Sequence, residues 1–270
     1  MPLLDIEEIQ EFSPIFRGKI GKGIAEGLMH LLAIDKINRL YDSCSSLSDT
    51  QFTSAILERL GVRYEVINSH ILSQLPAGPF ITVSNHPYGS IDGIMLVDMI
   101  GSIRPDYKVM VNRFLSRIVP LEQNFIYVKP TGENRTVPEK ESIMGIKATV
   151  AHIRSGHPLG LFPSGAVSDF SLKDGCIRDR QWQESAISLI SRMNVPVIPI
   201  RFLDRNSSFY YGLGLIHWKI RLLRLPSEVF NKSGRRTRIK IGQVIQPEQL
   251  SGYRDLAALG EFLRNSVYNL

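Results

Sequence analysis

Short apolar runs that alternate with helical patterns limit the possible folds of this chain more than any other feature of its sequence. Several of the runs are apolar throughout, as expected of strands that are covered on both faces. The pattern therefore predicts an α/β fold with a mostly parallel central sheet flanked by helices. The predicted strands are Arg63–Ile67, Phe80–Val83, Tyr107–Val111, Phe125–Val128, Leu159–Phe162, Val195–Phe202 and Thr237–Val244.

Helical patterns lie between and around these strands. We expect helices at Phe52–Leu60, Ile94–Ile100, Thr136–Gly156, Arg180–Met193 and Asp255–Val267. No strand pattern precedes the first predicted strand. The chain therefore divides into an N-terminal helical segment, residues 1–58, and an α/β domain, residues 59–270.

The N-terminal segment contains a basic amphipathic stretch from Phe16 to Tyr41. Such a stretch can lie in a membrane interface. A helix packed against the body of the protein has the same pattern, so both interpretations stay open. The apolar residues at helical spacing are Ile20, Ile24, Leu28 and Leu31, and the basic residues are Lys19, Lys22, Lys36 and Arg39.

Composition and charge narrow the classes of function. Hydrophobic residues make up 43% of the 270 residues and charged residues 21%, which is sufficient for a packed core. The formal net charge of +6 favours anionic partners. No RNP, zinc-finger or helix-turn-helix signature accompanies it, so we do not expect nucleic acid. No run approaches the roughly 20 apolar residues that span a bilayer, so action on lipid implies a protein on the membrane surface.

The cysteines and the N-terminus indicate the compartment. Cys44 and Cys176 form neither a disulfide framework nor a zinc cluster. The acidic N-terminus with Pro2 does not resemble a secretory signal. We therefore expect a cytoplasmic protein with reduced thiols and no bound metal.

The loop after the second predicted strand carries the most chemical information, because it contains His86 and Asp92. In open α/β sheets, ligands bind beyond the carboxyl ends of strands. Pro87 and Gly89 favour a tight loop that returns Asp92 to the His86 ring. A carboxylate on one imidazole nitrogen leaves the other nitrogen as a proton acceptor. The pair is therefore a candidate general base for a hydroxyl group.

Two further segments complete a family pattern. Residues 160–168 continue an apolar strand into the turn Phe162-Pro163-Ser164-Gly165, and residues 194–200 form a strand with two prolines, which suits the border of a pocket. In this order, the three segments resemble the glycerolipid acyltransferases of the lysophosphatidate type, whose pattern is NHxxxxD, a basic residue after a strand, FPEGTRS and VPVxP. The resemblance covers about residues 63–244.

Departures from that pattern bear on the acceptor. One residue more than in the family separates His86 from Asp92, Ser164 replaces Glu, and Lys129 stands where Arg is frequent. Val167 replaces the Arg expected to bind a substrate phosphate. The HPxGxxDG form is similar to a branch whose members are called hemolysins and which includes acyltransferases of ornithine and glycine aminolipids. Because Val offers no hydrogen-bond donor, lysophosphatidate becomes a less natural acceptor.

The resemblance implies the glycerolipid acyltransferase fold and a division of roles. His86 is the general base, oriented by Asp92, and an acceptor hydroxyl attacks the thioester of acyl carrier protein or coenzyme A without a metal or redox cofactor. Oxyanion donors would come from Gly93 or the Ser164–Gly165 turn. The residues expected to contact substrate are Asn85, Gly93, Lys129, Phe162, Pro163, Ser164 and Gly165.

A basic run extends from His217 to Lys240, with Glu228 as its single acid. Arg236, Arg238 and Lys240 alternate and so share one face of a strand. The run predicts either a solvated outer face or a binding surface for an anionic membrane or an acidic carrier protein.

The expected function is O-acylation of a lyso-lipid, with a lyso-aminolipid as acceptor, at the inner face of the cell membrane. One alternative is acylation of lysophosphatidate in phospholipid synthesis. Another is a non-catalytic lipid-binding or membrane-lytic protein. A binding protein has no need of a paired His and Asp, which favours an enzyme.

Overall fold

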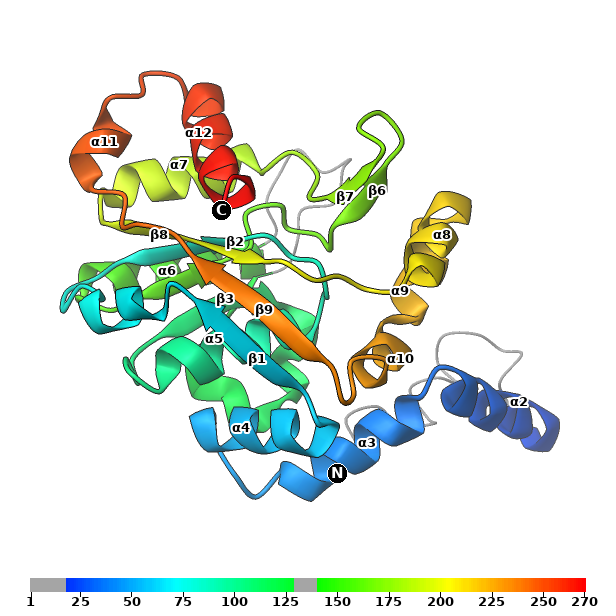
Figure 1. Cartoon of the computed structure of the whole chain (residues 1–270). Coiled ribbons are helices and arrows are strands. Elements are labelled where there is room, and N and C mark those ends of the chain that lie inside the picture. The colour runs from blue at the N-terminus through cyan, green and yellow to red at the C-terminus, as the bar shows by residue number, and fades with distance from the viewer. Residues whose placement is uncertain (1–17, 129–139) are drawn as a thin grey trace.

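The computed structural model describes residues 18–128 and 140–270, and its main sheet has seven strands in the order β1-β9-β8-β2-β5-β3-β4 (Figure 1). Neighbouring strands are parallel except β8 and β9. The predicted, mostly parallel sheet is confirmed, and every predicted strand overlaps an observed one. The strands are β1 (Arg63–Ile67), β2 (Ile81–Ser84), β3 (Lys108–Asn112), β4 (Phe125–Val128), β5 (Leu159–Leu161), β8 (Val197–Phe202) and β9 (Arg236–Ile241).

Helices cover both faces of the sheet, and each layer has its own apolar core. Phe52 and Leu96 belong to one core, and Ile190 and Leu263 belong to the other. This arrangement explains why the central strands β2, β5 and β8 are buried almost throughout. The first layer contains α4 (Asp49–Leu60) and α5 (Ile91–Gly101), and the second contains α6 (Lys140–Arg154), α7 (Glu184–Met193) and α12 (Leu256–Tyr268). The predicted start of α6 at Thr136 lies outside the described residues.

The remaining elements are shorter, and most had no clear sequence pattern. Between β8 and β9 the chain forms three helices, and between β5 and α7 it forms a small antiparallel hairpin (Figure 1). These elements are α8 (Ser208–Ile216), α9 (Trp218–Leu223), α10 (Leu225–Phe230), β6 (Asp169–Ser171) and β7 (Cys176–Arg178). The others are α11 (Pro247–Ser251) and the 3-10 turns η2 (Ser69–Gln74), η3 (Arg113–Arg117) and η4 (Val119–Asn124).

The amphipathic N-terminal stretch is two helices, not one. Ala33 adopts a left-handed conformation with φ of 60° and separates α2 (Gly18–Leu31) from α3 (Ile34–Cys44). Ile34 and Cys44 are buried, so α3 packs on the body of the protein. In the part of the chain that the structure describes, no helix has the length and apolar character needed to cross a membrane.

The basic run from His217 to Lys240 does not form one continuous surface. Arg221 and Lys232 are buried, and each forms an ion pair with a carboxylate. They are therefore excluded from the docking surface that the sequence suggested. Arg236 and Arg238 lie on the same exposed face of β9, as predicted, but both form ion pairs with acids there.

The sheet order brings the two predicted site loops together. Strands β2 and β5 are parallel neighbours, with Val83 opposite Leu161. The chain that leaves β2 towards His86 and the chain that leaves β5 towards Phe162 therefore emerge side by side at the carboxyl edge of the sheet.

Candidate active site

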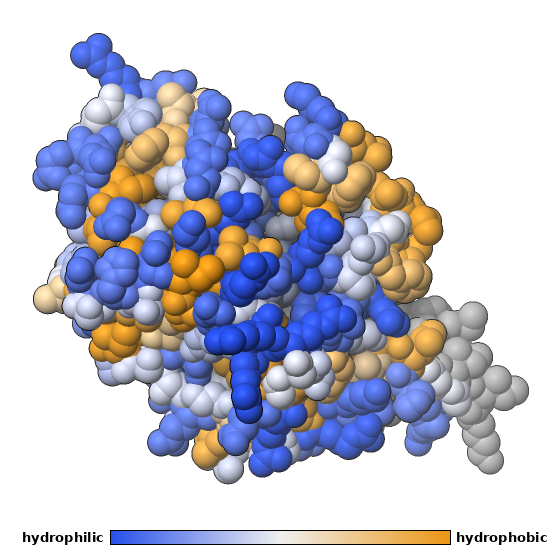
Figure 2. All heavy atoms as spheres, viewed as in Figure 1, coloured by the Kyte–Doolittle hydropathy of each residue, from blue (hydrophilic) through white to orange (hydrophobic). Residues whose placement is uncertain are grey.

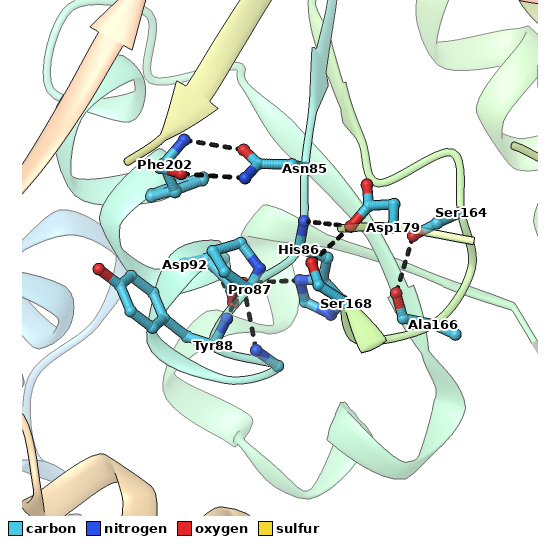
Figure 3. A network of polar contacts seen from close by, with 12 residues as sticks. Asn85, His86, Pro87, Tyr88, Asp92, Ser164, Ala166, Ser168, Asp179 and Phe202 are labelled. Atoms are coloured by element: carbon cyan, nitrogen blue, oxygen red, sulfur yellow. Dashed lines mark hydrogen bonds and ion pairs between the residues drawn. The ribbon is translucent and has the colours of Figure 1, made fainter. Parts of the chain in front are cut away.

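The loop between β2 and α5 returns Asp92 to the His86 ring, which is the arrangement expected from the sequence (Figure 3). His86 Nδ1 lies 2.7 Å from Asp92 Oδ2, and this carboxylate is its only partner among the described residues. Asp92 is fully buried, whereas 20% of the His86 side chain is exposed. Nδ1 is buried, so the exposed fraction belongs to other atoms of the side chain. The carboxylate holds Nδ1, which leaves Nε2 as the ring nitrogen that can accept a proton.

Backbone N–H groups of the same loop hold the Asp92 carboxylate. Oδ2 accepts hydrogen bonds from the N–H groups of Tyr88 and Gly89, both at 3.2 Å, and Oδ1 accepts one from Gly93 at 3.1 Å. Gly89 has φ of 75°, and a Cβ atom at this position would overlap Val167. Only glycine satisfies both conditions, so Gly89 allows this longer loop to close around Asp92.

Burial opposes charge on both members of the pair, but their mutual attraction outweighs it. Burial alone would lower the pKa of His86, yet the charge and hydrogen bonding of Asp92 raise it overall, with a smaller contribution from Asp179. Burial alone would raise the pKa of Asp92, yet His86 and the loop N–H groups lower it overall. The carboxylate is therefore ionised, and the imidazole is more basic than usual, as suits proton abstraction from a hydroxyl.

The second loop lies against the His86 ring. The rings of Phe162 and His86 have centroids 4.2 Å apart and planes inclined by 32°. The carbonyl of Pro163 accepts a hydrogen bond from the Gln183 N–H at 2.9 Å, which fixes the turn to the start of α7. Gly165 has φ of 63°, so this turn also uses the left-handed region that favours glycine.

Three donors of the predicted oxyanion region already have acceptors in this conformation. The Gly93 N–H donates to Asp92 Oδ1, and the Gly165 N–H donates to the Phe162 carbonyl at 2.9 Å. The Ser164 hydroxyl donates to the Ala166 carbonyl at 2.7 Å (Figure 3). An oxyanion that used any of these three donors would have to take it from its present acceptor.

Asn85 anchors the catalytic loop to β8. Its Nδ2 donates to the Phe202 carbonyl at 2.9 Å, and its Oδ1 accepts from the Phe202 N–H at 2.8 Å. The side chain is buried, so the structure gives it a positioning contact. Its contact with substrate stays a prediction.

Sequence reasoning missed Asp179, a buried carboxylate behind His86. Its Oδ1 accepts from the His86 N–H at 3.2 Å and from the Ser168 hydroxyl at 2.6 Å (Figure 3). Its Oδ2 accepts from the Trp182 indole at 3.3 Å. Ser168 also donates its N–H to the His86 carbonyl at 2.9 Å. Asp179 therefore joins the two loops, and burial raises its pKa. Its distance in sequence from His86 concealed this role.

The predicted substrate contact Lys129 lies outside the described residues. Across residues 18–128 and 140–270, no three His, Cys, Asp or Glu side chains gather in a way that could hold a metal ion.

Comparison with known proteins identifies the family. A protein-family model described as acyltransferase matches residues 22–270, which include both site loops. The chain belongs to this acyltransferase family. The family resemblance and the prediction of an enzyme are thereby confirmed. The expected fold class is confirmed by the mostly parallel sheet of this chain.

This acyltransferase is similar along almost its whole length to two curated proteins, each named lyso-glycine lipid O-acyltransferase. The protein from Phocaeicola vulgatus is 26% identical over 278 residues, which cover 99% of this chain and 95% of that protein. The protein from Bacteroides thetaiotaomicron is 26% identical over 277 residues, which cover 99% of this chain and 97% of that protein.

Among solved structures, the acyltransferase has a partial likeness to PlsC, the 1-acyl-sn-glycerophosphate (LPA) acyltransferase from Thermotoga maritima. The TM-score is 0.49 and the sequence identity 13%, over 81% of this chain and 79% of that chain.

Proposed function

We propose that this enzyme transfers a fatty acyl group from a thioester, carried by acyl carrier protein or coenzyme A, to the hydroxyl of a lyso-lipid. The observation that carries the proposal is the short contact between His86 and the buried Asp92, beside a loop from the neighbouring strand. The names of the two full-length relatives support a lyso-lipid acceptor. The preferred acceptor in this proposal is a lyso-aminolipid.

In the proposed reaction, His86 Nε2 removes the proton of the acceptor hydroxyl while the oxygen attacks the thioester carbonyl carbon. The resulting imidazolium is stabilised by the Asp92 carboxylate against its Nδ1 side. When the tetrahedral intermediate collapses, the carbon–sulfur bond breaks and the thiolate takes the proton back from His86. The products are an ester and a free thiol, and His86 returns to its neutral form.

The surroundings of Val167 support an acceptor without a phosphate monoester. Val167 is buried in an apolar cluster with Tyr210 and Tyr211 and offers no donor. Within the described residues, the guanidinium that reaches this loop is that of Arg221, which donates to the Ser168 carbonyl at 2.9 Å and forms an ion pair with an aspartate. A phosphate at this loop would therefore have to compete with the Ser168 carbonyl and the aspartate for the Arg221 guanidinium.

A competition assay tests the acceptor. Lyso-glycine lipid and lysophosphatidate are offered together with one acyl thioester, and both products are measured by mass spectrometry. Each missing charge-assisted hydrogen bond is worth about 1.5–3 kcal/mol, so we expect the aminolipid to be preferred by about tenfold or more. A tenfold preference for lysophosphatidate would contradict the proposed acceptor and favour phospholipid synthesis.

The proposed location is the inner face of the cell membrane, with no membrane-spanning requirement for the reaction. The acceptor resides in a bilayer, whereas acyl carrier protein and coenzyme A are soluble carriers. An enzyme that joins the two must therefore meet the membrane surface from the side that holds the carriers.

A further inference from the structure

Helices α8 and α9 expose large apolar side chains beside the active site. Ile216 is 73% exposed, Phe209 60% and Trp218 51%. Figure 2 shows hydrophobic residues gathered over these two helices, at the right of the view. Folded proteins rarely expose such a group of apolar residues without a partner for it. We define the α8–α9 patch as Phe209, Leu215, Ile216, Trp218, Ile220 and Leu223.

Basic residues accompany the patch in the sequence. Apart from Arg221, which is buried and ion-paired with Asp169, residues 205–227 contain three Lys and Arg residues and no Asp or Glu. The Arg224 guanidinium lies 5.5 Å from the centre of the Phe209 ring, so a cation accompanies an exposed aromatic side chain. Apolar side chains that enter the acyl layer, with Trp at the interface and basic residues near the head groups, complement an anionic bilayer.

The same two helices hold both loops of the active site. The Tyr211 hydroxyl in α8 donates to the Pro87 carbonyl at 3.0 Å, in the loop that carries His86. Arg221 in α9 donates to the Ser168 carbonyl at 2.9 Å, in the loop that follows β5. If α8 and α9 lie on a membrane, these two hydrogen bonds connect them directly to the loops around His86.

We propose that the α8–α9 patch inserts into the interface of an anionic membrane and so places His86 beside lyso-lipid that lies in the bilayer. This inference rests on the proposed function, because it assigns the membrane side of that same site. The interfacial anchor is thereby placed on the connection between β8 and β9, where the basic run begins, and not on the ion-paired outer face of β9.

Tryptophan fluorescence tests the insertion directly. The chain has two tryptophans, and Trp182 is only 5% exposed, so a change on vesicle binding reports on Trp218. With vesicles of equimolar phosphatidylcholine and phosphatidylglycerol, we expect a blue shift of the emission and quenching by brominated acyl chains. Trp218→Phe should abolish both signals. The absence of both signals in the wild-type enzyme would overturn the proposal.

Vesicle sedimentation with matched variants gives an independent test. Ile216→Asp and Leu223→Asp should each weaken binding by about tenfold or more, since each removes a large apolar side chain from the interface. The control is Ile103→Asp. Ile103 is 46% exposed, but it precedes β3 and so lies at the amino ends of the parallel strands, away from the active site at their carboxyl ends. Equal binding by Ile216→Asp and Ile103→Asp would overturn the proposal.

Activity assays separate this inference from the proposed function. The patch variants should acylate detergent-dispersed lyso-lipid at the wild-type rate and lose activity only on lyso-lipid embedded in vesicles. If the wild-type enzyme does not acylate dispersed lyso-lipid, the proposed function is contradicted. Vesicle binding by the wild type and the variants would still test whether the patch inserts into the membrane. If Ile216→Asp instead converts a dimer to a monomer in light scattering and leaves vesicle binding unchanged, the patch binds a second copy and the membrane proposal is wrong.

Discussion

Replacement of Asp92 by Asn removes one charge from the proposed general base with little change in shape. Asp92 Oδ2 faces three donors, namely His86 Nδ1 and the N–H groups of Tyr88 and Gly89, whereas Oδ1 faces the Gly93 N–H. The single amide oxygen of Asn therefore favours the Oδ2 position and keeps the tautomer of His86. The variant loses the negative charge that stabilises the imidazolium, and its amide NH2 group at the Oδ1 position no longer accepts from the Gly93 N–H.

The expected loss follows from that charge. A positioned general base contributes roughly 100-fold or more to the rate, and about 100-fold corresponds to about 2.7 kcal/mol of activation free energy. The pH profile should also change, because Asp92 is the main group that raises the pKa of His86. The wild-type rate should fall as the pH drops through this raised pKa, since the protonated ring cannot accept a proton. In Asp92→Asn, burial dominates, so the same decline should move to lower pH.

The assay is kcat/KM for acyl transfer across pH, with circular dichroism to verify folding. The structure offers a matched control in Asp106, whose Oδ2 lies 2.9 Å from His157 Nδ1 at the opposite edge of the sheet. Asp106→Asn weakens a His–Asp contact that is more exposed and also includes Arg104, and it should leave both the rate and the pH profile unchanged. Near wild-type turnover in folded Asp92→Asn, or a decline at unchanged pH, would refute the reasoning.

Three further predictions follow from the same contacts. Gly89→Ala should lower turnover and melting temperature, because residue 89 has φ of 75° and the added Cβ atom would overlap Val167. The second substitution Val167→Ala should restore part of both. Wild-type turnover and melting temperature in Gly89→Ala alone would contradict this. Asp179→Ala should lower the free energy of urea unfolding by about 1–3 kcal/mol for each donor left buried without an acceptor, and an unchanged unfolding curve would count against that role. The pKa of His86 is raised in the folded state, so its ion pair stabilises the protein fully below about pH 6.5 and this contribution is lost as the pH rises through the folded-state pKa. The difference in unfolding free energy between wild type and His86→Ala should therefore shrink over that range. A difference that grows would contradict the prediction.

The parts of this enzyme that the sequence predicts are those encoded locally. Most strands are short apolar runs bounded by their own turn residues, and His86 and Asp92 are six positions apart in sequence. Pattern and spacing were therefore sufficient to predict both the sheet and the pair. Asp179 is 93 positions from His86, and only the sheet order brings them together. The burial of Arg221 depends in the same way on Asp169, a residue of a distant hairpin. Long-range partners of this kind leave no periodic pattern in the chain.

The account depends most on acyl transfer by His86, and one measurement addresses it directly. Purified enzyme is incubated with an isotopically labelled acyl thioester and lyso-glycine lipid, and the lipid product is identified by mass spectrometry. We predict a labelled O-acyl product from the wild type and about 100-fold less from folded His86→Ala. No product from the wild type with any lyso-lipid offered, or equal product from both proteins, would contradict the account.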